Sequence, residues 1–531
     1  MSDHVETSAQ EEVFAFLSDP RTHALLLPVI RIDTHAAVVF LAGTDVYKVK
    51  RAVRFPFLDQ STREKRRRAC EAEVAVNRRY APDIYHGAVP ITREPRGFAI
   101  AGTGEPVEWA VHMRRFDETA TLDHVAERGE LEAPLVARLV ETLRAGYDEA
   151  EVRDGDAATA ALEGVVGETL EALADADAFF PKEDRAELAA AMTAAFGRLE
   201  PLLLSRGRGG CVRRCHGDLH LRNIALLDDV PTPFDAIEFD ESIATIDILY
   251  DLAFLLMDLW EKGLPAQASL VLNRYLWGAT ELNRELEGLA ALPLFMSLRA
   301  AVRAKVAALR LREVGAGPDE VAEARRYLGF ARGFLMPSPP RLVAIGGLSG
   351  TGKSTIAARV APALGRAPGA VHLRSDIERK RMLGADEHHR LPEEAYAHAL
   401  TERVFAALRD QAGRALAAGQ SVVVDAVHHR PEERDAIAAV AVRLGVPFTG
   451  LWLEAPLETA SERVEARRGD ASDATAAIVA RQAARPTGPI AWTRIDASGD
   501  AGSVVTAVLK AIDAFPGRFR RPASAARSGG G

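Results

Sequence analysis

Eight consecutive residues constrain this chain more than any other feature. They read Gly347-Leu348-Ser349-Gly350-Thr351-Gly352-Lys353-Ser354 and fill the pattern G-x-x-x-x-G-K-[ST]. The apolar run 342–345 precedes them, and a helical pattern at 355–360 follows. Glycines let backbone N–H groups turn inward around phosphate oxygens at a helix N-terminus. The segment therefore predicts a nucleotide-binding P-loop.

Each polar group of this loop has an expected role. Lys353 supplies a positive charge to the β and γ phosphates, and the Ser354 hydroxyl suits Mg²⁺. The residues expected to contact the nucleotide are Gly347, Ser349, Gly350, Thr351, Gly352, Lys353, Ser354 and Thr355.

The segments around the P-loop predict its fold. Apolar strands at 342–345, 371–373, 422–424 and 448–453 alternate with helical stretches. Such alternation predicts an α/β domain with a parallel, doubly wound sheet. Asp425 ends the strand at 422–424, and strand ends in such sheets line the ligand crevice. We therefore expect Asp425 to orient Mg²⁺ through water.

Two charged pairs add candidate catalytic groups. Asp376 follows the strand at 371–373, and Arg379 lies one helical turn later on the same face. Asp376 would accept the proton of an attacking hydroxyl and Arg379 would hold a substrate anion; the alternative is an Asp N-cap with an exposed Arg. Arg463 and Arg467 are four apart and would point from a lid toward the transferring phosphate. The alternative there is a solvated basic helix face.

A second motif lies far upstream, at His216-Gly217-Asp218-Leu219-His220-Leu221-Arg222-Asn223. Protein kinases use H-R-D-x-x-x-x-N, in which the Asp takes the substrate hydroxyl proton and the Asn binds Mg²⁺. Asp218 and Asn223 keep that spacing. The alternative interpretation is a turn with an Asp cap. We interpret the motif as the catalytic loop of a second phosphotransfer site.

His-Gly-Asp in place of His-Arg-Asp resembles the aminoglycoside phosphotransferases and choline-kinase-like enzymes, over residues 30–335. The resemblance implies that Lys48, or else Lys50, contacts the α and β phosphates. It also implies that Glu73, or else Glu71, pairs with that lysine.

The metal-binding acid of this resemblance lies in the stretch 234–240. Counting back from the Asp-x-x-x-Asp-Leu-Ala segment at 247–253 gives Glu238, where the family usually has Asp; Asp235 and Asp240 are the alternatives. A further departure is the nucleotide-covering loop 34–37, which contains no glycine. This loop predicts looser wrapping over the phosphates and modest ATP affinity.

The C-terminal part, 341–515, resembles small P-loop kinases such as gluconate kinase, zeta toxins and the kinase domain of polynucleotide kinase. The whole order resembles bacterial bifunctional aminoglycoside phosphotransferase/ATP-binding proteins. These resemblances imply ATP and Mg²⁺ as cofactors and phosphoryl transfer to a hydroxyl group of a small molecule.

Composition sets the remaining expectations. The chain has 66 Lys+Arg against 75 Asp+Glu, a net charge of −9, which argues against a protein that coats nucleic acid. A nucleic-acid 5′-end kinase stays an alternative for the second domain. The polar start 1–10 predicts no secretory signal, and no apolar run is long enough for a membrane span. Three cysteines predict no disulfide framework and favour a reducing cytoplasm.

We therefore predict an α+β two-lobed protein-kinase-like domain followed by an α/β doubly wound P-loop NTPase domain. The boundaries are an N-terminal segment 1–29, the kinase-like domain 30–335, a proline-rich linker 336–340, the P-loop domain 341–516 and a disordered tail 517–531. The predicted function is an ATP-dependent phosphotransferase with two nucleotide sites. The alternative is a P-loop ATPase that regulates a weakly active kinase-like binding domain.

Overall fold

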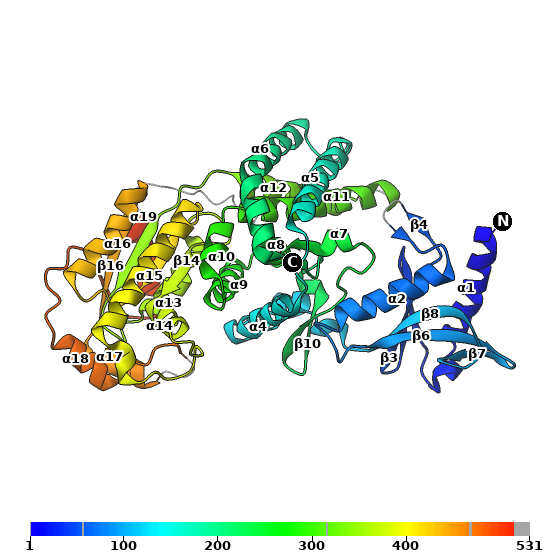
Figure 1. The fold of residues 1–531 in the computed structure, drawn as a ribbon, viewed down its shortest axis with the longest axis horizontal. Coiled ribbons are helices and arrows are strands. Elements are labelled where there is room, and N and C mark those ends of the chain that lie inside the picture. The colour runs from blue at the N-terminus through cyan, green and yellow to red at the C-terminus, as the bar shows by residue number, and fades with distance from the viewer. Residues whose placement is uncertain (1, 56–57, 315–316, 467–469, 514–531) are drawn as a thin grey trace, which may run out of the picture. The chain divides into compact units, whose positions relative to one another are not determined.

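The computed structural model describes residues 2–55, 58–314, 317–466 and 470–513. Contacts divide the chain into two compact units, 1–171 with 200–258 and 172–199 with 259–531. The predicted linker 336–340 contains no helix or strand, yet it lies inside the second unit. The predicted tail 517–531 lies outside the described residues. Figure 1 shows the ribbon and labels many of its helices and strands.

The first unit is built on a six-stranded antiparallel sheet in the order β1-β2-β3-β8-β6-β7. Strands β2 and β3 form a hairpin whose turn contains Gly43, and α2 is the next helix along the chain. The elements are α1 (Ser2–Ser18), β1 (Ile30–Asp33), β2 (Ala37–Ala42), β3 (Asp45–Lys50), β4 (Arg54–Phe55), β5 (Leu58–Asp59), α2 (Arg63–Asn77), β6 (Tyr85–Glu94), β7 (Gly97–Ile100) and β8 (Glu105–Arg114).

The two faces of this sheet carry different helices. Alternate side chains of a strand point to opposite faces, so Tyr47 and Val49 leave one face while Lys48 and Lys50 leave the other. Helix α1 packs on the Tyr47 face with its buried Phe14, and α2 packs on the Lys48 face, against β6 and β8. No pattern in residues 1–29 predicted helix α1.

The rest of the first unit is mostly helical, with two small antiparallel strand pairs, β10 with β11 and β9 with β12. Arg206 and Asp247 form a buried ion pair here, with Nε–Oδ2 at 2.7 Å and Nη2–Oδ1 at 2.8 Å. The chain from 122 to 261 forms α3 (Leu122–Glu127), α4 (Ala133–Glu149), α5 (Gly155–Ala174), α6 (Lys182–Arg206), β9 (Val212–Arg214), β10 (Ile224–Leu227), β11 (Val230–Pro233), α7 (Glu241–Ala244), β12 (Thr245–Asp247) and α8 (Ile248–Glu261). Residues 172–199, which include most of α6, belong to the second unit.

The second unit combines a helical part with a five-stranded sheet. The helical part consists of most of α6 together with α9 (Pro265–Trp277), α10 (Leu282–Gly288), α11 (Leu292–Val314) and α12 (Pro318–Leu335). The sheet part consists of β13 (Leu342–Gly346), α13 (Lys353–Val360), β14 (Val371–Arg374), α14 (Ser375–Met382), α15 (His398–Ala417), β15 (Val422–Asp425), α16 (Pro431–Leu444), β16 (Phe448–Glu454), α17 (Leu457–Ala466), α18 (Ala476–Ala483), β17 (Thr493–Asp496) and α19 (Ala501–Asp513).

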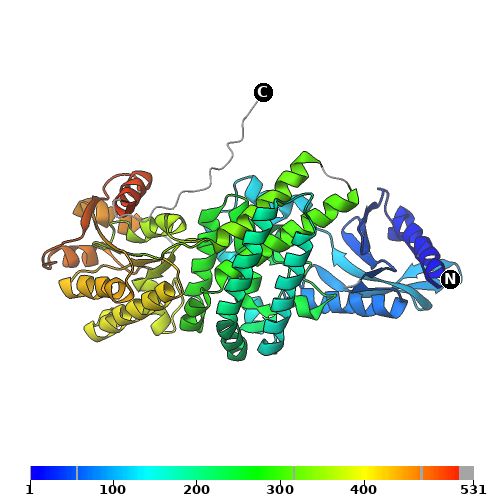
Figure 2. The ribbon, with the colours of Figure 1, turned by 90° about the horizontal axis from the view of Figure 1, so that it is seen from above.

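The predicted parallel sheet is confirmed. Its order is β14-β15-β13-β16-β17, and all of its pairings are parallel. Helices α13 and α19 pack on one face against Val343, Ile345 and Leu451, and α15 and α16 pack against each other and against β15 and β16. Figure 2 shows helices on both sides of the sheet. The central strand β13 therefore delivers the P-loop to the carboxyl edge, between its neighbours β15 and β16.

None of the described helices combines the length and the apolar character that a bilayer span requires. Cys70, Cys211 and Cys215 are free thiols, and all are buried.

Candidate active sites

The predicted catalytic loop of the first unit runs from β9 to a short helix, Leu221–Asn223. The Asn223 side-chain amide donates to the Asp218 carboxylate at 2.9 Å and to the Asp218 carbonyl at 3.0 Å. The Asp218 side chain keeps 39% of its exposure. The structure therefore brings together the two side chains that the spacing predicted and leaves the carboxylate accessible.

A buried carboxylate supports this loop from behind. Asp251 on α8 accepts a hydrogen bond from the Gly217 N–H at 2.8 Å and one from the Tyr147 hydroxyl at 3.0 Å. Gly217 has φ +85°, and a Cβ there would lie 2.9 Å from that of Ala244. Glycine is therefore required where the loop turns onto Asp251.

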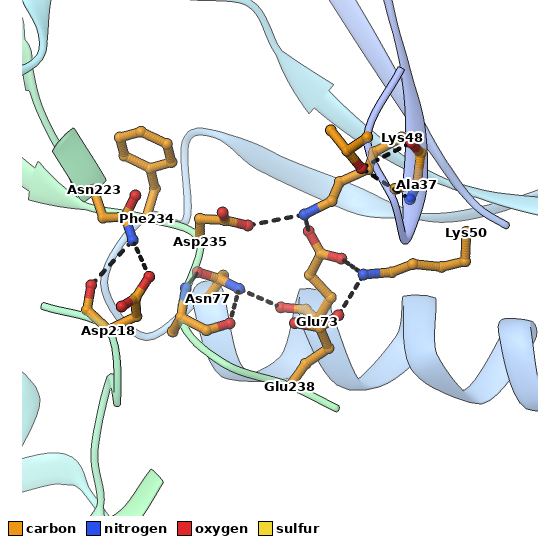
Figure 3. Close-up of polar contacts among 12 residues, drawn as sticks. Ala37, Lys48, Lys50, Glu73, Asn77, Asp218, Asn223, Phe234, Asp235 and Glu238 are labelled. Atoms are coloured by element: carbon orange, nitrogen blue, oxygen red, sulfur yellow. Dashed lines mark hydrogen bonds and ion pairs between the residues drawn. The ribbon is translucent and has the colours of Figure 1, made fainter. Parts of the chain in front are cut away.

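Two lysines of β3 share one glutamate of α2, as Figure 3 shows. Lys48 Nζ lies 2.9 Å from Glu73 Oε1 and 2.8 Å from Asp235 Oδ1. Lys50 Nζ lies 2.5 Å from Glu73 Oε2 and also pairs with Glu238. Glu73 is fully buried and Lys50 is 3% exposed, whereas Asp235 is 48% exposed. We call these five side chains the lysine–carboxylate cluster.

Opposite charges outweigh burial within this cluster. Burial lowers the pKa of Lys48, but Asp235 and Glu73 raise it well above its usual value. Burial also raises the pKa of Glu73, but Lys48 and Lys50 hold it below its usual value. Lys48, Lys50 and Glu73 are therefore charged at neutral pH.

Glu238 and Asp235, two of the candidate metal-binding acids, have different surroundings. Glu238 is buried and engaged by Lys50, so it faces the interior of the lysine–carboxylate cluster. Asp235 instead contacts Lys48 and is exposed, and its pKa is lowered mainly by the charge of Lys48. Figure 3 shows it between Lys48 and Asp218. Asn77 fixes this segment, because its Oδ1 accepts the Ala236 N–H at 2.8 Å.

In the second unit the P-loop has the predicted strand–loop–helix setting. Gly347, Gly350 and Gly352 all have positive φ, and a Cβ at Gly350 would collide with the Ala460 carbonyl. Lys353 Nζ donates to the Leu348 carbonyl at 2.9 Å. The loop also has a contact that no motif indicated, since the Ser349 N–H donates to the side chain of Gln482 on α18 at 2.9 Å.

Asp376 and Asp425 lie at the carboxyl ends of β14 and β15. Helix α14 begins at Ser375 with Arg374 at its N-cap, so Asp376 lies in the first turn and is not the N-cap that the alternative interpretation required. Loss of hydration raises the pKa of Asp376; Arg374 opposes the shift and Asp425 adds to it.

Asp425 is held ionised by the side chains of the neighbouring strand. His372 Nε2 lies 3.5 Å and Arg374 Nε 3.7 Å from Asp425 Oδ2. Burial raises the pKa of Asp425, but His372, Arg374 and Lys353 together lower it below its usual value. Arg374 also pairs with Asp470 at 3.0 Å. The carboxylate therefore keeps its charge beside the P-loop lysine.

The predicted arginines are held by backbone carbonyls. Arg379 Nη1 donates to the Ala395 carbonyl at 2.7 Å, and its guanidinium lies over the Tyr396 ring at 4.7 Å. Burial lowers the pKa of Arg379, and the charge of Asp376 opposes that shift. Arg463 donates to the Ala497 carbonyl at 2.8 Å. Arg467 lies outside the described residues.

A pocket of about 380 Å³ opens beside the P-loop. Its lining includes Gly350, Gly352 and Thr355 from the loop and its helix, Arg463 from α17, and Asp500 near the start of α19. Gly350, Gly352 and Thr355 were predicted to contact the nucleotide. The α19 side was missed, because nothing in the local sequence links residues 150 positions apart.

Helix α9 completes the outer edge of the sheet, which no motif predicted. The side chain of Asn273 accepts the His372 N–H at 2.7 Å and donates to the Ala370 carbonyl at 3.2 Å. The Trp277 indole N–H donates to the His372 carbonyl at 2.7 Å. These side chains satisfy backbone groups that an edge strand such as β14 otherwise leaves unpaired. They therefore hold the strand that leads into Asp376.

We expect Asn273→Leu to loosen β14. The substitution leaves the His372 N–H of the strand and the Ala370 C=O just before it without their partner, which costs about 1–3 kcal/mol for buried groups. Hydrogen–deuterium exchange of the peptide that contains β14 should become faster, while Asn283→Leu, an exposed site on α10, serves as the matched control. Equal exchange of β14 in both variants would show that α9 does not support the strand.

Residues 342–489 match the family model described as AAA domain. Uncharacterized proteins of Mycobacterium bovis and Mycobacterium tuberculosis are 29% identical over 475 residues, which is 88% of this chain and 92% of each relative.

The solved structures that resemble parts of the chain are distant. A gluconokinase from Sinorhizobium meliloti has a TM-score of 0.25 and 20% identity and covers 34% of this chain and 95% of its own. The Mycobacterium tuberculosis APS kinase CysC has a TM-score of 0.26 and 23% identity and covers 33% and 99%. A choline/ethanolamine kinase family protein from Mesorhizobium loti has a TM-score of 0.35 and 14% identity and covers 61% and 99%. The family match places an AAA domain, with its P-loop, in the C-terminal part of this chain.

Proposed function

We propose that the protein is an ATP-dependent phosphotransferase with two nucleotide sites, each of which transfers the γ-phosphate to a hydroxyl group of a small molecule. One observation carries the proposal. Each unit combines a lysine suited to phosphate with a separately placed carboxylate: Lys48 with Asp218 in the first, Lys353 with Asp376 in the second. Phosphoryl transfer needs chiefly this positioning and charge.

In the first unit Lys48, fixed by Glu73, would meet the α and β phosphates. Asp218 would accept the proton of the acceptor hydroxyl, and its bond to Asn223 orients it. Mg²⁺ prefers oxygen ligands, and the Asn223 amide oxygen and the exposed Asp235 carboxylate fit that preference better than the buried Glu238. Bound Mg²⁺ would neutralise charge on the phosphates.

In the second unit the loop N–H groups, Lys353 and Ser354 would hold the phosphates and Mg²⁺, with the ionised Asp425 behind them. The pocket lined by Thr355 and Arg463 lies directly beside the loop, which suits the nucleoside part of ATP. Asp376 would accept the acceptor proton. Roles for Arg379 and Arg467 in holding the acceptor or the phosphate stay predictions.

Magnesium-dependent ATP turnover of the whole chain tests the proposal, measured with and without a pooled metabolite extract. We expect Asp218→Asn and Lys353→Ala each to remove a different extract-stimulated part of the turnover, by about tenfold or more. The exposed substitutions Asp319→Asn and Lys262→Ala are matched controls.

Three other outcomes contradict parts of the proposal. If Lys353→Ala alone removes all turnover, the first unit is a binding or regulatory module. If Asp218→Asn alone does so, the P-loop has no transferase role. Turnover that neither variant changes would exclude both sites.

A further inference from the structure

Three metal-ligating side chains meet on the first sheet, away from the lysine–carboxylate cluster. Asp45 begins β3, His86 lies on β6 and His112 lies on β8. Their ligand atoms all lie within 4.8 Å of one another. No other part of the described chain brings three His, Cys, Asp or Glu ligands together in this way.

The strand register explains the meeting. His112 lies opposite Tyr47 on β3, so its side chain leaves the sheet on the face of Tyr47 and Asp45. The Lys48 face is the opposite one. The rings of Tyr47 and His112 stack in parallel, with centroids 4.8 Å apart and an interplanar angle of 7°. Tyr47 therefore fixes the plane of the His112 imidazole.

An irregularity in β6 supplies the third ligand. Tyr85 pairs with Met113 and Gly87 pairs with His112, so His86 is an extra residue between two regular pairs. Such a bulge redirects a side chain that regular pairing would send elsewhere. Here it brings the His86 ring to within 4.8 Å of the His112 ring, centroid to centroid.

Distances and exposure suit a small cation. His112 Nε2 lies 2.6 Å from Asp45 Oδ1. Asp45 and His112 are partly buried, and His86 is exposed, so the group opens to solvent on one side. Tetrahedral Zn²⁺ with bonds of about 2.0–2.1 Å places its ligands roughly 3.4 Å apart. Small rotations of these side chains reach that spacing.

We propose that Asp45, His86 and His112 form a binding site for a divalent transition-metal ion of the Zn²⁺ type, with water as the fourth ligand. Two imidazoles and one carboxylate are the ligands that Zn²⁺ uses, whereas Mg²⁺ prefers oxygen ligands alone. The ion joins β3, β6 and β8 at one end of the sheet. Because the ion binds the folded first unit, its stabilisation of that unit grows with the free ion concentration relative to the dissociation constant.

Zn²⁺ titration of the chelator-treated full-length protein tests the site, by calorimetry and by competition with a chromophoric chelator. We expect one tight equivalent, weakened at least tenfold in His86→Ala and in Asp45→Asn. His389→Ala, at an exposed histidine outside the cluster, is the matched control and should bind as the wild type does. The wild type should also show a Zn²⁺-dependent rise in Tm that His86→Ala lacks.

Substitution with Co²⁺ gives a second readout, because four-coordinate Co²⁺ with two imidazoles absorbs strongly in the visible range. His86 is exposed, so its substitution leaves the fold intact, and the far-ultraviolet circular dichroism spectrum checks this. Absence of a tight equivalent in the wild type, or one that survives the double substitution His86→Ala and His112→Ala, would overturn the proposal.

Discussion

Asp376→Asn is expected to lower phosphotransfer by the P-loop site about 10²–10⁴-fold and, at neutral pH, to raise the unfolding temperature of the protein. The loss follows if Asp376 accepts the proton of the acceptor hydroxyl. The higher unfolding temperature follows from lost hydration, because removal of this carboxyl from water raises its pKa in the folded state. The folded protein therefore holds an unfavourable negative charge, which Asn removes.

The raised pKa of Asp376 makes the stability of the folded protein depend on pH. A carboxyl whose pKa is higher in the folded than in the unfolded state favours folding at low pH, and this contribution is lost as the pH rises through the folded pKa. The stability gain of Asp376→Asn should therefore appear near neutral pH and vanish in acid. In the wild type the transfer rate should fall in acid as Asp376 protonates, at a pH above the usual aspartate range.

Initial rates and thermal unfolding across pH 4–8 check both statements, with Asp435→Asn on the exposed side of α16 as the matched control. A variant that loses activity and also unfolds at a lower temperature would indicate a structural role for Asp376. A variant that keeps its activity would remove it from the mechanism.

The sequence predicted local features well, because their geometry depends on short spacings. Asp218 and Asn223 are five residues apart within one loop, and their hydrogen bond follows from the loop itself. The P-loop is equally local, since the strand, the glycines and the first turn of α13 are continuous in the chain.

Contacts between distant segments could not be predicted in the same way. Counting back from the Asp-x-x-x-Asp-Leu-Ala segment at 247–253 gave Glu238. The residues between the two include α7, and no sequence pattern predicts the backbone conformation there. Only the folded chain shows that Asp235 faces Lys48. The same limit applies to Asn273 and β14, which are about 100 residues apart.

The basic run 63–68 shows the same limit. Five of its six residues are Lys or Arg, as on a solvated helix face, but Arg66 is buried and its Nη2 lies 2.9 Å from Glu108 Oε2. Gln10, on the missed helix α1, donates to the same carboxylate at 2.8 Å. A buried arginine needs a partner from another element, and sequence periodicity carries no record of that partner.

Glu73→Gln is expected to lower the free energy of unfolding of the first unit by about 3–5 kcal/mol, the usual cost of breaking a buried ion pair from one side. Glu73 is fully buried and is the only carboxylate that contacts both Lys48 and Lys50 among the described residues. Glutamine keeps the shape of the side chain. The loss of unfolding free energy therefore measures how much the negative charge of Glu73 stabilises the two lysine ammonium groups.

Urea unfolding followed by circular dichroism measures this loss, and Glu71→Gln is the matched control. Glu71 lies two residues away on α2, where it is 47% exposed and pairs with Arg67, so its loss should cost less than about 0.5 kcal/mol. Because the pKa of Glu73 is lowered by folding, its stabilisation is present at neutral pH and is lost as acid protonates the folded carboxyl. Wild type and Glu73→Gln should therefore converge in acid. Equal destabilisation by both variants at neutral pH would mean that Glu73 does not stabilise the two lysines.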